Sequence, residues 1–349
     1  MFTIVSGIGL LLVTLAGFSL FSLKMPKGQL AMSGMANAAI ATFLIEAVHK
    51  YITGDLLGIA FFHRLGETAG GLGGVAAAAM VPICMGANPV LAIVAGVAVG
   101  GYGILPGFIA GYIVGLLAPV IEEKLPEGLN IIGGALLIAP LARIIVIAVN
   151  PAVNATLAAI GGTISAATEQ SPVVMGFLLG GIIKMICTSP LSSMALTAML
   201  GLDGLAMGIA AIACVGGSFT NGLIFSRLKL GDRSNVMAVM LEPLTQADII
   251  TSNPLPIYCS NFFGGGFAGI SAAVFHIVNN APGTASPIPG LLAPFAFNPA
   301  SHVIGALLFA ILGGCVAGIA GSRVFRQKIK VPAVPANDER GQTPVATGV

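Results

Sequence analysis

Residues 241–258 read Leu241-Glu-Pro-Leu-Thr-Gln-Ala-Asp-Ile-Ile-Thr-Ser-Asn-Pro-Leu-Pro-Ile-Tyr258, a polar segment with three prolines between long apolar runs. The prolines exclude a continuous helix, because proline lacks the backbone N–H that an interior helical position donates. If this segment faced lipid, each backbone N–H or C=O group without a hydrogen-bond partner would cost several kcal/mol. We therefore expect a re-entrant hairpin or a broken helix that lines a cavity. The alternative is an ordinary loop outside the membrane.

The chain around this segment has the composition of a membrane protein. Of its 349 residues 56% are apolar and only 8% are charged, with a mean hydropathy of +0.99, whereas a soluble domain carries about 25% charged residues. The 48 glycines and 21 prolines favour closely packed and interrupted helices, as in transporters, over a simple membrane anchor.

The apolar runs predict an all-α polytopic membrane protein with about ten transmembrane helices, together with broken or re-entrant segments too short to cross. The first run lacks the basic flank of a cleaved signal peptide, so we expect it to be retained. The predicted spans are 2–22, 31–48, 70–84, 88–104, 105–121, 130–149, 172–187, 191–215, 261–279 and 301–322, with 236–241 leading into the segment quoted above.

The basic sequence after the last predicted span indicates the orientation. Arg323, Arg326, Lys328 and Lys330 lie directly beyond it, and the positive-inside rule then places the C-terminus in the cytoplasm. We expect residues 1–325 to form one transmembrane domain. Residues 326–349 are expected to be a disordered cytoplasmic tail, because they are polar and contain prolines.

Several function classes are excluded by what the sequence lacks. The net charge is only +2, and no basic patch with interleaved aromatic residues occurs, which argues against nucleic-acid binding. Five widely spaced cysteines predict neither a disulfide framework nor a metal site. No nucleotide-binding loop and no nucleophile beside a base is present, so we expect no cofactor and no catalytic residues.

One predicted helix carries a regular stripe of glycine. Gly103, Gly107, Gly111 and Gly115 recur every four residues. Such a stripe is expected to pack against another helix, either within the subunit or at a dimer seam, because small residues let helix backbones approach closely. The alternative is a stripe that lines a pore.

A single arginine lies deep in an apolar run. A charge at membrane depth is costly and is normally paired, so we expect Arg143 to have a carboxylate partner. Glu169 and Glu242 are the two candidates.

The segment at 241–258 also supplies the strongest candidates for substrate binding, since each polar group at membrane depth is a functional candidate. A carboxylate can bridge two hydroxyl groups, and an amide supplies both a donor and an acceptor, which is the set that a neutral sugar requires. The predicted substrate-binding residues here are Glu242, Thr245, Gln246, Asp248 and Asn253.

Two other regions contribute polar candidates. The turn at 187–193 offers Thr188, Ser189 and Ser192, although hydroxyls in membrane helices mostly bond to their own backbone. Glu46 and His49 are three residues apart, which on a regular helix places them on one face. We expect them to hold a substrate or a proton; the alternative is a helix end at the membrane interface.

Further stretches resemble a known family. A glycine-rich helix, Gly107-Phe-Ile-Ala-Gly111-Tyr, leads through Leu125-Pro126 to the proline-marked span Ile138-Ala-Pro140-Leu141, as in fructose-type IIC subunits. Over residues 1–325 the chain resembles component IIC, the membrane subunit of the bacterial phosphoenolpyruvate-dependent sugar phosphotransferase system. Within that system it is most similar to the PfoR-type regulatory branch.

Two signatures of that family can be laid on this chain. Thr-Glu-Gly-Ala-Ile-Pro-Phe followed by Asp-Pro corresponds to 241–243 followed by Asn253-Pro254, which by resemblance makes Glu242 the sugar-binding glutamate. Asp-Met-Gly-Gly-Pro-Val-Asn-Lys falls on 187–193, where only the proline agrees. The missing Asp, Asn and Lys argue against fructose as the substrate and leave the location of the site unchanged.

The resemblance implies a homodimer in the bacterial inner membrane, with a scaffold part at the interface and a transport part that carries the sugar to a cytoplasmic IIB protein for phosphorylation. The IIA and IIB components are expected as separate proteins. Two alternatives stay open. One is a proton-coupled secondary transporter of a sugar or sugar acid that uses Glu46, His49 or Glu242. The other is a membrane sensor of the PfoR type.

Overall fold

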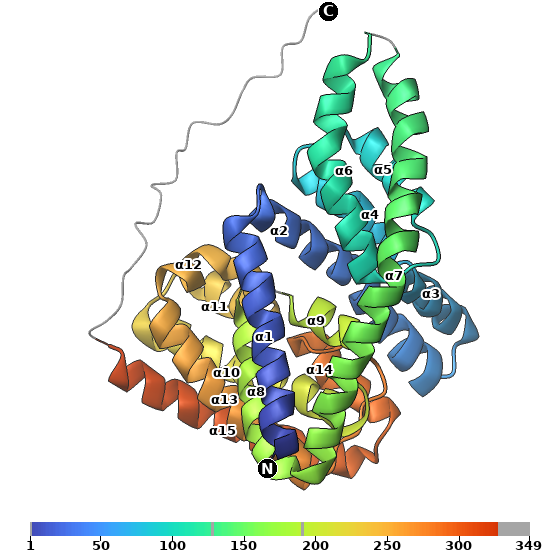
Figure 1. The fold of residues 1–349 in the computed structure, drawn as a ribbon. Helices are drawn as coiled ribbons and strands as arrows, with labels where there is room; N and C mark the ends of the chain where they lie inside the picture. Colours follow the sequence, from blue (N-terminus) through green and yellow to red (C-terminus); the bar gives the residue numbers. More distant parts are fainter. Residues whose placement is uncertain (1, 127–128, 190–191, 327–349) are drawn as a thin grey trace, which may run out of the picture.

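The computed structural model describes residues 2–126, 129–189 and 192–326, and within these ranges it contains helices and no β-strand (Figure 1). The expected all-α, multi-pass architecture is therefore confirmed. The proposed tail at 326–349 lies outside the described residues except for Arg326, as do positions 190 and 191 of the turn at 187–193.

Six helices among the described residues are long and apolar enough to cross a membrane. A seventh crossing results if the bent pair α3 (Ala60–Gly71) and α4 (Gly73–Cys84), which meet at 54°, forms one span. The six are α1 (Phe2–Lys24), the helix Gly28–Leu56 that begins with α2 (Gly28–Ala39), α6 (Ile104–Lys124), α7 (Asn130–Gln170), α10 (Gly204–Leu228) and α15 (Ala300–Val324).

The shorter elements connect and interrupt these spans. α5 (Pro89–Ala98) and α8 (Pro172–Thr188) are apolar but shorter than the long spans. The remaining elements are α9 (Ser193–Met199), α11 (Arg233–Leu241), a 3-10 turn Pro243–Gln246, α12 (Ala247–Ser252), α13 (Pro254–Val274), α14 (Pro287–Leu292) and a second 3-10 turn Ala293–Ala296.

α7 is longer than the sequence predicted. The expected span 130–149 continues without a break through Pro151 to Gln170, which makes 41 residues. At 1.5 Å per residue this helix is about 60 Å long, twice the roughly 30 Å of the hydrocarbon core. In Figure 1 it runs along both groups of helices described next, so it is the element that joins them.

Two of the four apolar cores among the described residues define two groups of helices (Figure 1). The first core is built mainly by α8, α10, α13 and α15, and the second by α4, α5 and α6 with the first half of α7. Backbone contact at glycine holds the first group tightly. A Cβ on Gly269 of α13 would lie 2.0 Å from the carbonyl oxygen of Gly176 in α8, and one on Gly314 of α15 would lie 1.9 Å from that of Gly216 in α10.

The glycine stripe of α6 has the same role in the second group. A Cβ on Gly107 would lie 2.3 Å from the carbonyl oxygen of Gly74, and one on Gly111 would lie 2.9 Å from the Cα of Ala78. Both neighbours belong to α4. The stripe therefore packs against a helix of the same subunit, which confirms the packing interpretation.

The predicted partner of Arg143 was wrong. Its Nη1 donates hydrogen bonds to the carbonyl oxygens of Ala98 (3.2 Å) and Gly100 (2.9 Å), and its guanidinium lies 4.8 Å from the ring centre of Tyr102. These carbonyls lie at the C-terminal end of α5, where the helix dipole is negative and the last carbonyls have no intrahelical donor. A helix end thus replaces the expected carboxylate.

The segment at 241–258 is broken as expected. α11 ends at Leu241, a 3-10 turn and the six-residue α12 follow, and α13 begins at Pro254. Pro254 occupies the first turn of α13, where the missing N–H costs nothing. The breaks leave Glu242 at the C-terminal end of α11, outside regular helix.

Candidate functional site

A cavity of about 950 Å³ lies between the helices α1 and α2 and the broken segment. We call it the Glu242 cavity. Apart from Glu242, its polar lining consists of hydroxyl and amide side chains, so it offers many hydrogen-bonding groups and one charge. These residues are Ser19, Ser22, Gln29, Ser33, Asn37, Ser189, Glu242, Thr245, Thr251 and Tyr258.

Hydrogen bonds hold Glu242 in the lining of this cavity. Its carboxylate accepts hydrogen bonds from the backbone N–H of Leu244 and from the hydroxyl of Ser286, the latter at 3.3 Å. It also lines a small extension of about 20 Å³ with Ser192, Ser193 and Ser286. Two accepted hydrogen bonds leave part of the acceptor capacity of the carboxylate free for a ligand.

A buried lysine provides the counter-charge. The side chain of Lys184 is 0% exposed, and its ammonium donates to the carbonyl oxygen of Cys214 at 3.4 Å. It interacts electrostatically with Glu242. Space for its aliphatic stem comes from two glycines, since a Cβ on Gly217 or Gly265 would lie 2.3 Å from carbon atoms of that stem. Lys184 lines neither the cavity nor its extension, so Glu242 is the one charge among the described lining residues.

Four of the predicted residues meet at this cavity. Glu242, Thr245 and Ser189 line its main part, and Ser192 lines the extension. The hydroxyl of Thr245 donates to the backbone carbonyl of Glu242 at 2.8 Å. The hydroxyl of Ser192 caps α9 by accepting from the N–H of Ala195 at 3.2 Å.

Three others support the structure without lining the cavity. Thr188 donates to the carbonyl oxygen of Lys184 at 2.9 Å, one turn back in its own helix, as hydroxyls in membrane helices commonly do. The amide of Gln246 accepts from Asn235 at 2.7 Å, and that of Asn253, which is 2% exposed, donates to a carbonyl of α12. The contacts of Gln246 and Asn253 fix the broken segment.

The side chain of Asp248 lies outside the described part of the chain. The backbone at this position belongs to α12. Its predicted role in substrate binding stays a prediction.

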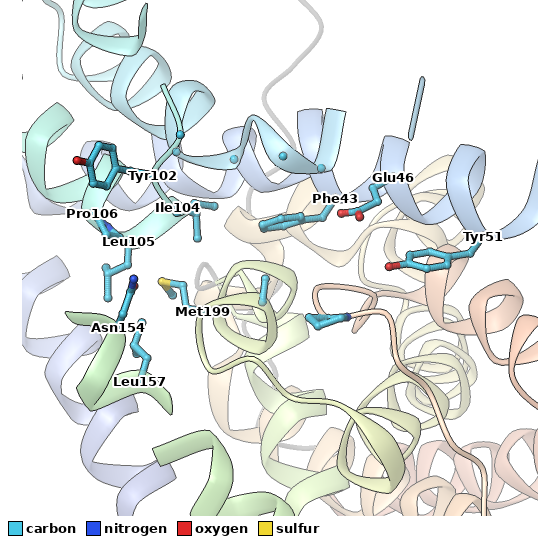
Figure 2. A pocket seen from close by; sticks show the side chains of 18 residues that line it. Phe43, Glu46, Tyr51, Tyr102, Ile104, Leu105, Pro106, Asn154, Leu157 and Met199 are labelled. Carbon is cyan, nitrogen blue, oxygen red and sulfur yellow. The ribbon is translucent and has the colours of Figure 1, made fainter. Parts of the chain in front are cut away.

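Glu46 and His49 lie elsewhere and have different neighbours. Glu46 lines a second cavity of about 490 Å³ (Figure 2) and pairs with Lys50 at 3.1 Å. The imidazole of His49 instead contacts the hydroxyl of Thr53 at 3.3 Å and stacks on Phe62. Ala47–Leu56 is a π-helix, whose wider turn removes the regular-helix spacing on which the expected shared face depended.

Several lining residues were missed by the sequence reasoning. Gln29, Ser33 and Asn37 recur every four residues on α2, so a helical period of polar residues was a usable signal. Ser286 is different. It precedes α14 in a loop far along the chain, and nothing in its local sequence indicates a contact with Glu242.

These features define a class: a multi-pass, all-helical membrane protein with polar cavities bounded by a broken helix, as found in membrane transporters. A family model described as phosphotransferase system, EIIC matches residues 30–335. The chain therefore belongs to the EIIC family, the membrane component of that system. Membership implies a sugar substrate and a cytoplasmic IIB partner. No curated protein and no solved structure matches the chain.

Proposed function

We propose that the protein binds a neutral sugar in the Glu242 cavity and carries it across the membrane for phosphorylation by a separate IIB protein. The observation that carries this proposal is the placement of one partly engaged carboxylate among hydroxyl and amide groups in a cavity of about 950 Å³. That volume lies within the range of about 300–1,000 Å³ typical of small-molecule sites.

The charge distribution supports a neutral ligand. Glu242 is the one charge among the described residues that line the cavity, so an anionic solute would lie beside a charge of the same sign. Sugar hydroxyl groups donate to a carboxylate and accept from amide and hydroxyl donors. Thr245 and Ser189 in the cavity, and Ser192 in its extension, can make such bonds. We also place Asp248 among the ligands.

The finer architecture is proposed from the family resemblance and the apolar segments. Among the described residues, three apolar helices of 10–17 residues accompany the six or seven possible crossings, and we count them as re-entrant or partly inserted pieces to reach about ten transmembrane segments. We propose a homodimer with a scaffold part and a transport part, a cytoplasmic C-terminus following Arg323, and a relation to the PfoR-type branch.

Two other functions are distinguished by experiment. A proton-coupled transporter is favoured by the carboxylate of Glu46 in the second cavity, and a sensor is favoured by the resemblance to the PfoR branch. Sugar uptake that requires phosphorylated IIB supports the proposed function. Uptake that a protonophore abolishes supports proton coupling, and ligand binding without uptake supports a sensor.

The first test is thermal stabilisation of the purified full-length protein. D-glucose, D-fructose, D-mannitol and D-galactitol are compared with the anionic D-gluconate, because a ligand that binds the native state raises its melting temperature. We expect at least one neutral compound to stabilise the protein and gluconate to have no effect. Stabilisation by gluconate alone would contradict the proposal of a neutral substrate.

A further inference from the structure

We propose that the cavity beside Glu46 is a second binding site for the same neutral sugar, one step along its route from the Glu242 cavity. This inference rests on the proposed function for the identity of the ligand. We call this space the Glu46 cavity. It has a volume of about 490 Å³ and combines a carboxylate, a phenol and an amide with aromatic and glycine walls (Figure 2).

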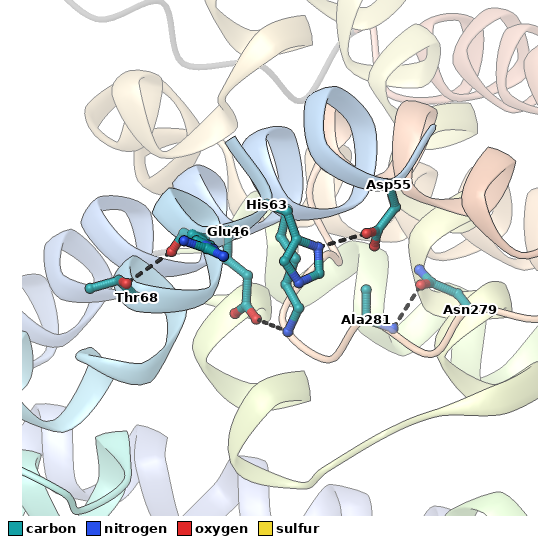
Figure 3. A network of polar contacts seen from close by, with 8 residues as sticks. Glu46, Asp55, His63, Thr68, Asn279 and Ala281 are labelled. Atoms are coloured by element: carbon teal, nitrogen blue, oxygen red, sulfur yellow. Dashed lines mark hydrogen bonds and ion pairs between the residues drawn. The ribbon is translucent and has the colours of Figure 1, made fainter. Parts of the chain in front are cut away.

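The carboxylate of Glu46 is placed for ligand binding. In Figure 2 it lies between the rings of Phe43 and Tyr51, which come from the same helix. Its Oε1 accepts from the ammonium of Lys50 at 3.1 Å (Figure 3). The pair has no net charge, so it favours a neutral ligand over an ion.

The glycine wall leaves room at this carboxylate. A Cβ on Gly70 would lie 2.0 Å from Oε2 of Glu46, so a side chain there would displace the carboxylate. Gly71 also lines the cavity, but a Cβ on it would have no atom within 4 Å. The first glycine is therefore required for the position of Glu46, whereas the second borders open space.

The other walls fit a sugar as well. Tyr51 and Phe43 present aromatic rings, and Asn154 of α7 contributes an amide. A concave site with apolar and aromatic walls and a few polar groups is the usual form of a small-molecule site. The polar pair of His63 and Asp55, at 2.7 Å, lies beside this region in Figure 3 but does not line the cavity.

The same three segments line both cavities at successive positions. The helix Gly28–Leu56 contributes Phe43 to the Glu46 cavity and Ile40 to the extension of the Glu242 cavity. In the same way α9 contributes Met199 to one and Ser193 to the other. The loop before α14 contributes Pro282 and Ser286, respectively.

The layer that separates the two cavities, made by Phe43, α9 and the loop before α14, is tightly fitted. Gly283 has a φ of +84°, and a Cβ on it would lie 3.0 Å from the ring of Phe43. The hydroxyl of Ser193 donates to the carbonyl of Ala285, which ties α9 to the loop. Two polar cavities therefore lie on either side of one layer made by Phe43, α9 and the loop. A sugar that passes this layer leaves one carboxylate site and enters the other.

Protection of an introduced thiol tests the second site. Gly71→Cys is made in the full-length protein with the three incompletely buried cysteines, Cys84, Cys259 and Cys315, replaced by serine. The thiol is modified by a charged methanethiosulfonate, with and without the four neutral sugars named above. At about ten times the dissociation constant, a bound sugar should slow modification about tenfold, because only the free cavity reacts.

Two carboxylate variants decide where the protecting sugar lies. We expect Glu46→Gln to remove the protection and Glu242→Gln to retain it. Gly70→Ala, which pushes on the Glu46 carboxylate, should also weaken protection. The unprotected modification rate of each variant shows whether the cavity is intact. No protection by any neutral sugar would overturn the proposal, as would protection lost in Glu242→Gln and kept in Glu46→Gln.

The outcomes separate this proposal from the proposed function. If thermal stabilisation by sugar disappears in Glu46→Gln and persists in Glu242→Gln, the Glu242 cavity is not the substrate site and the Glu46 cavity stands. If stabilisation needs Glu242 while the Gly71→Cys thiol is never protected, the proposed function stands and the second site fails.

Discussion

Replacement of Glu242 by glutamine is the sharpest test of the Glu242 cavity, because the change removes a charge and keeps the shape. The amide oxygen of glutamine can still accept from the N–H of Leu244. The amide NH2 can donate to the hydroxyl of Ser286, which now donates to the carboxylate. We therefore expect the ligand-free protein to keep its melting temperature within a few degrees.

Sugar binding should weaken much more. A hydrogen bond to a charged group contributes about 1.5–3 kcal/mol and a neutral one about 0.5–1.5 kcal/mol, so loss of charge at two sugar hydroxyls costs about 1–3 kcal/mol. Since about 1.4 kcal/mol corresponds to a factor of ten, the dissociation constant should rise roughly tenfold to a hundredfold.

The effect can be read from thermal stabilisation at one fixed sugar concentration, with Glu46→Gln as the parent so that only the Glu242 cavity binds the sugar. At 100 times the dissociation constant of the parent, binding stabilises the native state by about 2.7 kcal/mol, and a hundredfold weaker variant gains only about 0.4 kcal/mol. Glu123→Gln is the matched control, because Glu123 is exposed at the end of α6 and lines neither cavity. Equal stabilisation of parent and Glu242→Gln would refute the assignment of the carboxylate.

Three further substitutions test the packing. Gly269→Ala should destabilise the protein by about 1–3 kcal/mol, because the added Cβ meets the α8 backbone. The control Gly162→Ala adds its Cβ to open space and should not destabilise the protein, so equal melting temperatures of the two variants would contradict the contact. Gly283→Ala should lower the melting temperature more than Gly86→Ala, since both glycines have positive φ but only Gly283 is crowded. An equal fall in melting temperature in the two variants would mean that backbone strain alone destabilises them and that the contact with Phe43 does not contribute. Arg143→Met should cost about 1–3 kcal/mol by removing donors from the α5 carbonyls, and unchanged thermal unfolding would exclude that role.

The sequence predicted those features that depend on local chemistry. The prolines at 243, 254 and 256, set among polar residues, predicted the broken helix that is observed, because proline removes a backbone donor. Proline alone does not decide a break, since Pro140 and Pro151 lie inside the continuous α7. The glycines of α6 predicted a close helix contact because four-residue spacing forms a continuous small face. The partner, α4, was not predictable, since any small-faced helix satisfies the same pattern.

Other features depend on neighbours that only the fold brings together. The partner of Arg143 is the end of α5, and a helix end has no side-chain signature that marks it as a cation site. The π-helix at 47–56 changed which residue meets Glu46, so the contact is with Lys50 and not with His49. Ser286 reaches Glu242 across 44 positions of sequence. The polar stripe on α2 is the exception, because its period was visible in the sequence.

The two carboxylates share an arrangement that fits the proposed cycle. Glu46 is paired with Lys50, and Glu242 is the one charge among the described lining residues of its cavity, so neither cavity offers a charge that attracts an anion. A phosphate group brings a charge of about −1.5 to −2 at neutral pH, and that charge would stand beside a carboxylate, which repels it. The phosphorylated sugar should therefore bind more weakly than the sugar itself. In the proposed cycle, phosphorylation by IIB would both trap the sugar and expel it from the site, so the direction of transport would follow from the charge of the product.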